Sequence, residues 1–157
     1  MGEIISIVYQ PQDKVYGKHV GDFIREPLQE ATLIAGHGIE GDRKAGRNRK
    51  RQLNILSLEW LQGLRPLGYQ TKPGSFGEQI IVKGLPLETL QPGDRLRVGG
   101  EALLEITKPR TGCIRLEAAQ GLSNAAFDGQ VGMMARVIDG GAIRVGDSVE
   151  MLAADRR

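Results

Sequence analysis

The chain of 157 residues has one cysteine, two histidines, few aromatic residues and little net charge. A single cysteine cannot form a disulfide within the chain. Because the two histidines, His19 and His37, are not at metal-ligand spacing, a structural zinc site is not expected either. Basic side chains exceed acidic ones by only two, 21 against 19, so the whole molecule has no strong field to hold a polyanion. Any anion-binding site must therefore be local.

Long apolar runs are also missing. No stretch approaches the roughly 18 apolar residues that a membrane helix needs, and the first residues lack the basic and apolar regions of a secretion signal. We therefore expect no membrane partner and a reducing, cytoplasmic compartment. The length fits one domain, residues 1–157.

A basic run at residues 43–51 is the clearest local concentration of charge. It comprises Arg43, Lys44, Arg47, Arg49, Lys50 and Arg51. None of the seven aromatic residues lies between Phe23 and Trp60, so stacking on bases is poorly supported and a nucleic-acid partner is not favoured. A small phosphorylated or otherwise anionic ligand suits these arginines at least as well, because guanidinium forks match phosphate oxygens. The alternative is a solvated loop without a ligand.

The cysteine, Cys113, stands close to Lys108, Arg110 and Arg115 in sequence. Nearby positive charge lowers the pKa of a thiol, and the thiolate is both the nucleophile and the soft-metal ligand. Cys113 is thus a candidate reactive centre. The alternative is a small packed core residue, which is a common role for an unpaired cysteine.

Twenty-two glycines and short alternating apolar runs predict a mainly β domain with tight turns. The clearest hairpin joins residues 94–98 and 101–106 through Gly99 and Gly100. The chain closes on runs at 134–138, 142–145 and 148–151, which predict a meander. Further strands are expected at residues 4–10, 31–35, 52–56 and 78–83.

Two short helices are expected beside these strands. One occupies residues 57–65 with Ser57 as its N-cap, and the other occupies residues 114–120 and ends at Gly121. The second would place Cys113 near a helix N-terminus, where partial positive charge also favours the thiolate. The predicted architecture is a small barrel or strongly coiled sheet with helices at its ends.

Six blocks of sequence occur in the order typical of one known family. They lie at residues 38–46, 51–59, 74–79, 90–96, 110–113 and 132–147. In this respect the chain resembles the MOSC domain, which is named after the C-terminal part of molybdenum cofactor sulfurase. The resemblance covers about residues 20–152.

The resemblance implies a MOSC-like β-barrel of mixed strands with a few short helices, and a role with sulfur or the molybdenum cofactor, a pyranopterin phosphate. It implies that Cys113 carries sulfur as a persulfide or ligates molybdenum. Arg43, Arg47 and Arg51 would then serve the phosphate. The remaining implied cofactor-binding residues are Gln79, Arg110 and Arg136.

The implied partners are a cysteine desulfurase or other sulfur donor, and a molybdoenzyme or cofactor as acceptor. Pyridoxal phosphate would belong only to the partner desulfurase. Two departures from the family pattern bear on ligand geometry. Gly112 stands where proline usually precedes the cysteine, and Gln79 stands where asparagine is frequent.

Three functions follow from these observations. The first is a cofactor-binding or sulfur-carrier module centred on Cys113. The second is a molybdenum-dependent reductase of N-hydroxylated compounds that receives electrons from separate partners, since the chain has no cysteine cluster of its own for an electron-carrying centre. The third is a non-catalytic barrel that binds a small anion or RNA, with Cys113 merely packed.

Overall fold

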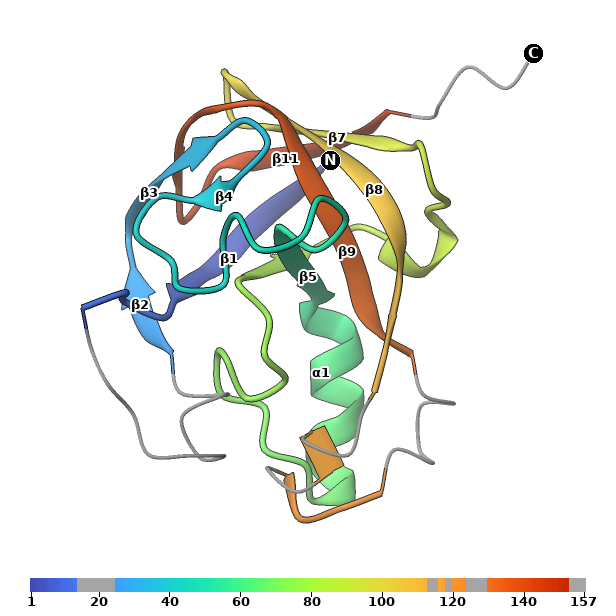
Figure 1. Cartoon of the computed structure of the whole chain (residues 1–157). Helices are drawn as coiled ribbons and strands as arrows, with labels where there is room; N and C mark the ends of the chain where they lie inside the picture. Colours follow the sequence, from blue (N-terminus) through green and yellow to red (C-terminus); the bar gives the residue numbers. More distant parts are fainter. Residues whose placement is uncertain (14–24, 113–115, 118–119, 124–129, 153–157) are drawn as a thin grey trace.

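A computed structural model describes residues 1–13, 25–112, 116–117, 120–123 and 130–152. Within these residues the fold is mainly β, as predicted, with a closed barrel of seven mixed strands (Figure 1). In order around the barrel the strands are β1 (Gly2–Tyr9), β11 (Ser148–Leu152), β7 (Arg95–Val98), β8 (Ala102–Thr111), β9 (Gln130–Asp139), β5 (Leu53–Ser57) and β6 (Ile80–Lys83).

The barrel closes because β1 pairs with two other strands of the barrel, β11 and β6. Its first residues pair with β11, and residues further along pair with β6. A shift of register between Ile4 and Ser6 separates two parts of the β1–β6 ladder. Such an irregularity increases local twist, which a sheet needs in order to close on itself. A short strand, β2 (Glu26–Leu28), pairs with the end of β1.

Aliphatic side chains fill the barrel. Alternate residues of its strands point inward, as in Ile4, Ile55, Ile80 and Leu104, and each of these is at most 2% exposed. They leave an apolar void of only about 10 Å³ between them. The interior therefore has no room for a cofactor, and a ligand must bind at an end or on the outside of the barrel.

Helix α1 (Leu58–Leu64) joins the parallel strands β5 and β6 and covers the outside of the barrel beside them. It begins as predicted, because the Ser57 hydroxyl accepts a hydrogen bond from the Trp60 amide and caps the first turn. Leu61 and Leu64 pack with Phe76 in a second apolar cluster outside the barrel. A one-turn 3-10 helix, η2 (Arg65–Leu67), follows α1.

The predicted hairpin is confirmed: β7 and β8 pair antiparallel from Arg95↔Glu105 to Val98↔Ala102. The predicted meander is wrong. Its three strands exist as β9, β10 (Gly141–Arg144) and β11, but β10 belongs to a separate sheet with β3 (Glu30–Ile34) and β4 (Gly38–Ile39). Gly140 lets the chain pass from β9 in the barrel to β10 in the second sheet, because a Cβ at this position would collide with the Leu33 carbonyl oxygen of β3.

The strand predicted at residues 78–83 begins two residues later than predicted, at Ile80, because the chain still bends at residue 79. Of the second predicted helix, Leu116, Glu117 and Gln120 are helical, and the Gly121 amide bonds the Glu117 carbonyl at the predicted end. The 3-10 helix η3 (Leu87–Thr89) was not predicted. No helix among the described residues is long and apolar enough to cross a membrane.

Candidate functional site

The basic loop, residues 43–51, is anchored at its start by the buried carboxylate of Asp42. Asp42 is fully buried, and its Oδ1 accepts hydrogen bonds from the amides of Gln10 (3.1 Å) and Lys44 (3.3 Å). The Arg43 amide in turn bonds the Gln10 carbonyl at 2.8 Å. These contacts tie the first residues of the loop to the chain that follows β1.

The end of the basic loop is held against strand β8. The Thr107 hydroxyl donates to the Lys50 carbonyl, and the Gln52 amide nitrogen donates to the Arg49 carbonyl. Arg43 and Lys44 are half-buried, whereas Arg47 and Arg51 are exposed. The side chains of Arg47 and Arg51 make no hydrogen bond or ion pair within the described residues. The loop therefore offers positive charge to solvent from an anchored backbone.

Gln79 connects this loop to the barrel. It is 3% exposed, its Oε1 accepts from the Asn54 amide at 2.7 Å, and its Nε2 donates to Asp42 Oδ2 at 3.4 Å. Both ends of the side-chain amide thus have protein partners. Gln79 was predicted to bind the cofactor. Its side chain instead bonds Asn54 and Asp42, and so it helps to position the basic loop.

A turn at residues 74–77 brings Arg110 to the same region. The Glu78 carboxylate accepts from the amides of Gly74 and Phe76 and so fixes the turn. The Phe76 carbonyl accepts a hydrogen bond from the guanidinium of Arg110, which lies near the end of β8. Arg110 is only 9% exposed, so its charge is held in a defined position.

Glu78 itself is 1% exposed. Burial raises the pKa of the Glu78 carboxyl above its ordinary value, and hydrogen bonds from the Gly74, Glu78 and Phe76 amides together with the charge of Arg110 offset only part of that effect. Its hydrogen bonds show that Glu78 fixes the turn at residues 74–77.

Asn54 joins the turn to β5. Its side-chain nitrogen donates to the Gly77 carbonyl at 3.3 Å, and its Oδ1 is a buried acceptor without a partner in the described part of the chain. We refer to Asp42, Asn54, Glu78, Gln79 and Arg110 as the polar network. An acceptor left over in such a network can receive a hydrogen bond from a ligand.

Cys113 lies outside the described residues, but residues on both sides of it contact the same loop. Arg110 bonds the Phe76 carbonyl, as described above. On the other side, Leu116 is fully buried in the cluster that contains Phe76, and the Gln120 side chain donates to the carbonyls of Gln70 (2.9 Å) and Ser75 (3.2 Å). The segment that carries the cysteine is thus fastened at both ends to residues 70–76.

Arg136 lies apart from these residues. It pairs across the sheet with Glu105, and its guanidinium forms an ion pair with the Glu105 carboxylate at 2.9 Å. Arg95 binds the same carboxylate at 3.2 Å. Glu105 is five positions from Arg110 along β8, or roughly 16 Å at the usual rise of a strand. The structure therefore does not bring Arg136 together with Arg110.

Three members of the polar network, Asp42, Asn54 and Glu78, were not predicted as functional residues. Two signals in the sequence point to them. Glu78 precedes an apolar strand, where a carboxylate is unexpected unless it is satisfied by hydrogen bonds, and Asp42 is an acid directly before six cations. Asn54 gives no such signal, because a polar residue in an alternating strand usually faces solvent.

Comparison with solved structures shows the same fold in other proteins. The YuaD protein from Bacillus subtilis is 22% identical, with a TM-score of 0.76 over 99% of this chain and 98% of that one. YiiM from Escherichia coli is 25% identical, with a TM-score of 0.66 over 99% of this chain and 72% of that one.

Comparison with known sequences adds two matches. A reductase of Gibberella moniliformis is 29% identical over 83 residues, which span 50% of this chain but only 15% of that protein. The MOSC domain matches residues 41–150, which contain the basic loop and the whole polar network. The chain therefore belongs to the MOSC domain family, which is associated with the molybdenum cofactor.

Proposed function

We propose that the chain binds the molybdenum cofactor, or a sulfur-charged relative of it, and uses Cys113 as a persulfide carrier or molybdenum ligand. The observation that carries this proposal is the attachment of both flanks of Cys113 to one loop. Arg110 and Gln120 bond carbonyls of residues 70–76 from opposite sides of the cysteine. The same loop leads through Glu78 and Gln79 to the anchored start of the basic loop.

The residues present suit an anionic ligand. The cofactor carries a phosphate, and the basic loop offers exposed guanidinium groups on Arg47 and Arg51. Arg110 adds a buried cation, and the free Oδ1 of Asn54 can accept a hydrogen bond. Arg43, Arg47, Arg51 and Arg110 would hold the cofactor, while Gln79 and Asp42 would position the loop. When bound, the cofactor would supply redox chemistry at molybdenum.

As a sulfur carrier, Cys113 needs no oxidant. Its thiolate attacks the terminal sulfur of a donor persulfide. The sulfur–sulfur bond of the donor breaks, a new one forms at Cys113, and the donor leaves as a thiolate. Having no second cysteine, the chain cannot discharge the persulfide into an internal disulfide. The sulfur would stay on Cys113 until an acceptor arrives.

The test compares the natural protein with Cys113→Ser and with the double variant Arg47→Ala, Arg51→Ala. After incubation with a cysteine desulfurase and cysteine, mass spectrometry should find added sulfur on Cys113, and molybdenum analysis of protein from a cofactor-producing host should find metal. The serine variant should lose the sulfur and any molybdenum that Cys113 ligates, because a hydroxyl replaces a soft thiolate.

The double variant should keep the reactive thiol but bind cofactor about a hundredfold more weakly, since each charge-assisted hydrogen bond contributes about 1.5 kcal/mol or more. Sulfur uptake and metal content that are normal in the serine variant would contradict the proposal. So would a serine variant that differs only in a lower melting temperature, because that result assigns Cys113 to packing.

The match to a reductase supports a second candidate, a molybdenum-dependent reductase of N-hydroxylated compounds that receives electrons from separate partners. Metal-loaded protein supplied with electron carriers should then reduce an N-hydroxylated base, and Cys113→Ser should abolish turnover. Metal binding without turnover would favour the carrier function. Absence of both would leave the small-anion or RNA-binding barrel.

A further inference from the structure

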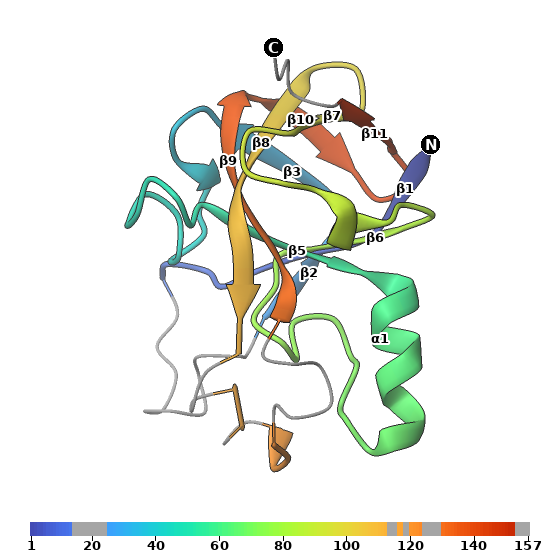
Figure 2. The ribbon, with the colours of Figure 1, turned by 90° about the vertical axis from the view of Figure 1, so that its right-hand side faces the viewer.

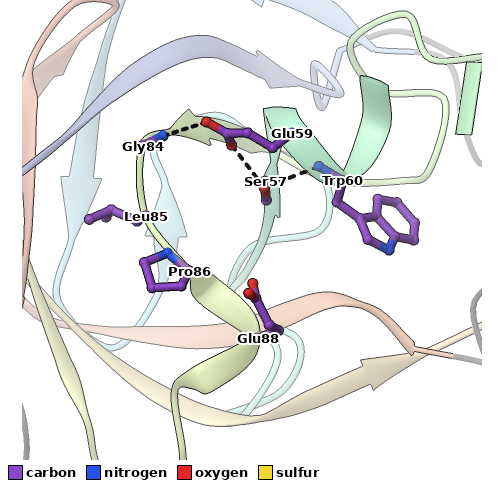
Figure 3. A pocket seen from close by; sticks show the side chains of 7 residues that line it. All are labelled: Ser57, Glu59, Trp60, Gly84, Leu85, Pro86 and Glu88. Carbon is purple, nitrogen blue, oxygen red and sulfur yellow. Dashed lines mark hydrogen bonds between the residues drawn. The ribbon is translucent and has the colours of Figure 1, made fainter. Parts of the chain in front are cut away.

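A surface cavity of about 410 Å³ lies at the start of α1, between this helix and the segment that connects β6 to η3 (Figure 3). Its size is within the range of small-molecule sites. Helix α1 and the basic loop lie on opposite sides of the barrel (Figure 2), so the cavity is separate from the basic loop, although Trp60 at its edge packs against Phe76. The cavity is lined by Ser57, Glu59, Trp60, Gly84, Leu85, Pro86 and Glu88.

Of the described residues that line the cavity, the charged ones are two glutamates. Glu59 has a structural role, because its carboxylate accepts from the Gly84 amide (2.7 Å) and the Ser57 hydroxyl (3.0 Å). Slight burial acts to raise the pKa of Glu59, but hydrogen bonds from the Gly84 and Glu59 amides and Ser57, with the charge of Lys83, lower it overall. Glu59 therefore remains an anion at neutral pH.

Glu88 is different because its carboxylate is available to a ligand. It is exposed, and within the described residues it makes no hydrogen bond or ion pair. Figure 3 shows the carboxylate directed from η3 toward Ser57, on the side of the cavity that faces Glu59. A cation between the two would be attracted by both glutamates, and Glu88 would keep its full hydrogen-bonding capacity for it.

Apart from Ser57 and Gly84, the remaining walls are apolar and fixed in place. Leu85 is 8% exposed, and Pro86 has a rigid ring. Trp60 packs edge-on against the buried Phe76, with ring centroids 5.2 Å apart and planes at 71°. Such walls can receive the methylene stem of a ligand without rearranging, and an indole also attracts a cation.

We propose that this cavity binds a cation carried on an apolar stem, either the lysine side chain of a partner protein or a free alkylamine. Both sources have the same chemistry, with the ammonium at Glu88 and the methylenes against Leu85, Pro86 and Trp60. An anion would meet two carboxylates, and no group of three ligand side chains within the described residues would hold a metal ion. The proposal is independent of the function of Cys113.

The experiment uses the only tryptophan of the chain as its reporter. Because Trp60 lines the cavity, its fluorescence should change saturably when n-butylammonium is added at constant ionic strength, and 1-butanol should bind about fivefold more weakly. A short capped peptide with one lysine is compared with the same peptide carrying norleucine. Tighter binding of the lysine peptide than of the free amine identifies a protein partner, and the reverse order identifies a small amine.

Two variants complete the test. Glu88→Gln should weaken binding of the amine and of the lysine peptide about fivefold, because it removes the charge from an exposed residue without changing its shape. Glu150→Gln, on an exposed position of β11, is the matched control and should bind as the natural protein does. Equal binding of the neutral and charged probes, or unchanged binding by Glu88→Gln, would overturn the proposal.

Discussion

Among single residues, Gln79 shows how one methylene group can decide what a side chain does. The amide of Gln79 reaches Asn54 on one side and Asp42 on the other. Asparagine, which the family pattern favours here, is shorter by one methylene and cannot span the same two partners from this backbone position. The longer residue therefore makes a link between β5 and the basic loop that asparagine would leave open.

We predict that Gln79→Asn lowers the free energy of unfolding by about 1–3 kcal/mol, because a buried acceptor or donor loses its partner. The variant should also bind phosphate-bearing ligands more weakly, since Asp42, whose Oδ1 holds the start of the loop, would lose the Gln79 hydrogen bond that fixes its Oδ2. Urea denaturation measures the first effect and ligand titration the second. Gln91→Asn, at an exposed residue whose side chain has no partner in the described part of the chain, should change neither.

The sequence identified the residue types of this site better than their roles. The basic run was found from the sequence itself and Arg110 from the family resemblance, and the polar network, of which Arg110 is a member, does adjoin the start of the basic loop through Gln79 and Asp42. The role of Gln79 could not be predicted, because its partners lie 25 and 37 residues away in the chain. Arg136 was assigned to the cofactor because its block resembles the family, whereas its position on the sheet gives it Glu105 as a partner.

Among the secondary structure elements, the positions of strands in the sequence were easier to predict than the pairing of one strand with another. Alternation of apolar residues shows which face of a strand is buried, and it located β1, β3, β5 and β9 to within a few residues. Alternation does not show which strand lies alongside. The expected meander therefore failed at β10, where Gly140 lets the chain cross close to β3 and join a second sheet.

The pairing of strand β9 with β5 depends on Gly132, which, unlike Gly140, has a positive φ. Gly132 has a φ of +77°, and a Cβ there would collide with the Ile55 carbonyl oxygen and the Leu56 side chain of β5. Two neighbouring strands approach each other at this point only because one of them has no side chain. A larger residue must push β5 away from β9, and these two strands carry residues of both apolar clusters.

We predict that Gly132→Ala destabilises the protein by about 3 kcal/mol or more, from the cost of the left-handed backbone plus the overpacking. Gly146→Ala is the matched control, because Gly146 also has a positive φ, +98°, but no atom within 4 Å of a built Cβ. It should cost only about 1–2 kcal/mol. Thermal or urea unfolding of the two variants makes the comparison, and equal losses would show that the close approach to β5 contributes nothing.

At the scale of the whole molecule, two apolar clusters share the same strands. The barrel interior contains Ile55 and Ile80, and the cluster under α1 contains the next residue of each strand, Leu56 and Ile81. Because successive side chains point to opposite faces of a strand, neither cluster can lose its strands without breaking the other. The second sheet is tied in as well, since Leu33 and Ile143 are buried in the barrel cluster.

This sharing predicts a single cooperative transition. Trp60 packs against the cluster under α1 and far-UV circular dichroism follows the strands, so urea unfolding curves from the two signals should superimpose. Leu61→Ala, at a residue of α1 that is 2% exposed, should lower the free energy of unfolding by about 2–5 kcal/mol. Both urea midpoints should then move to lower urea together. Leu67→Ala, at a residue 59% exposed, should shift neither. A Trp60 transition at lower urea than the dichroism would show that α1 detaches first, and would mean that strands β5 and β6 do not couple the two clusters.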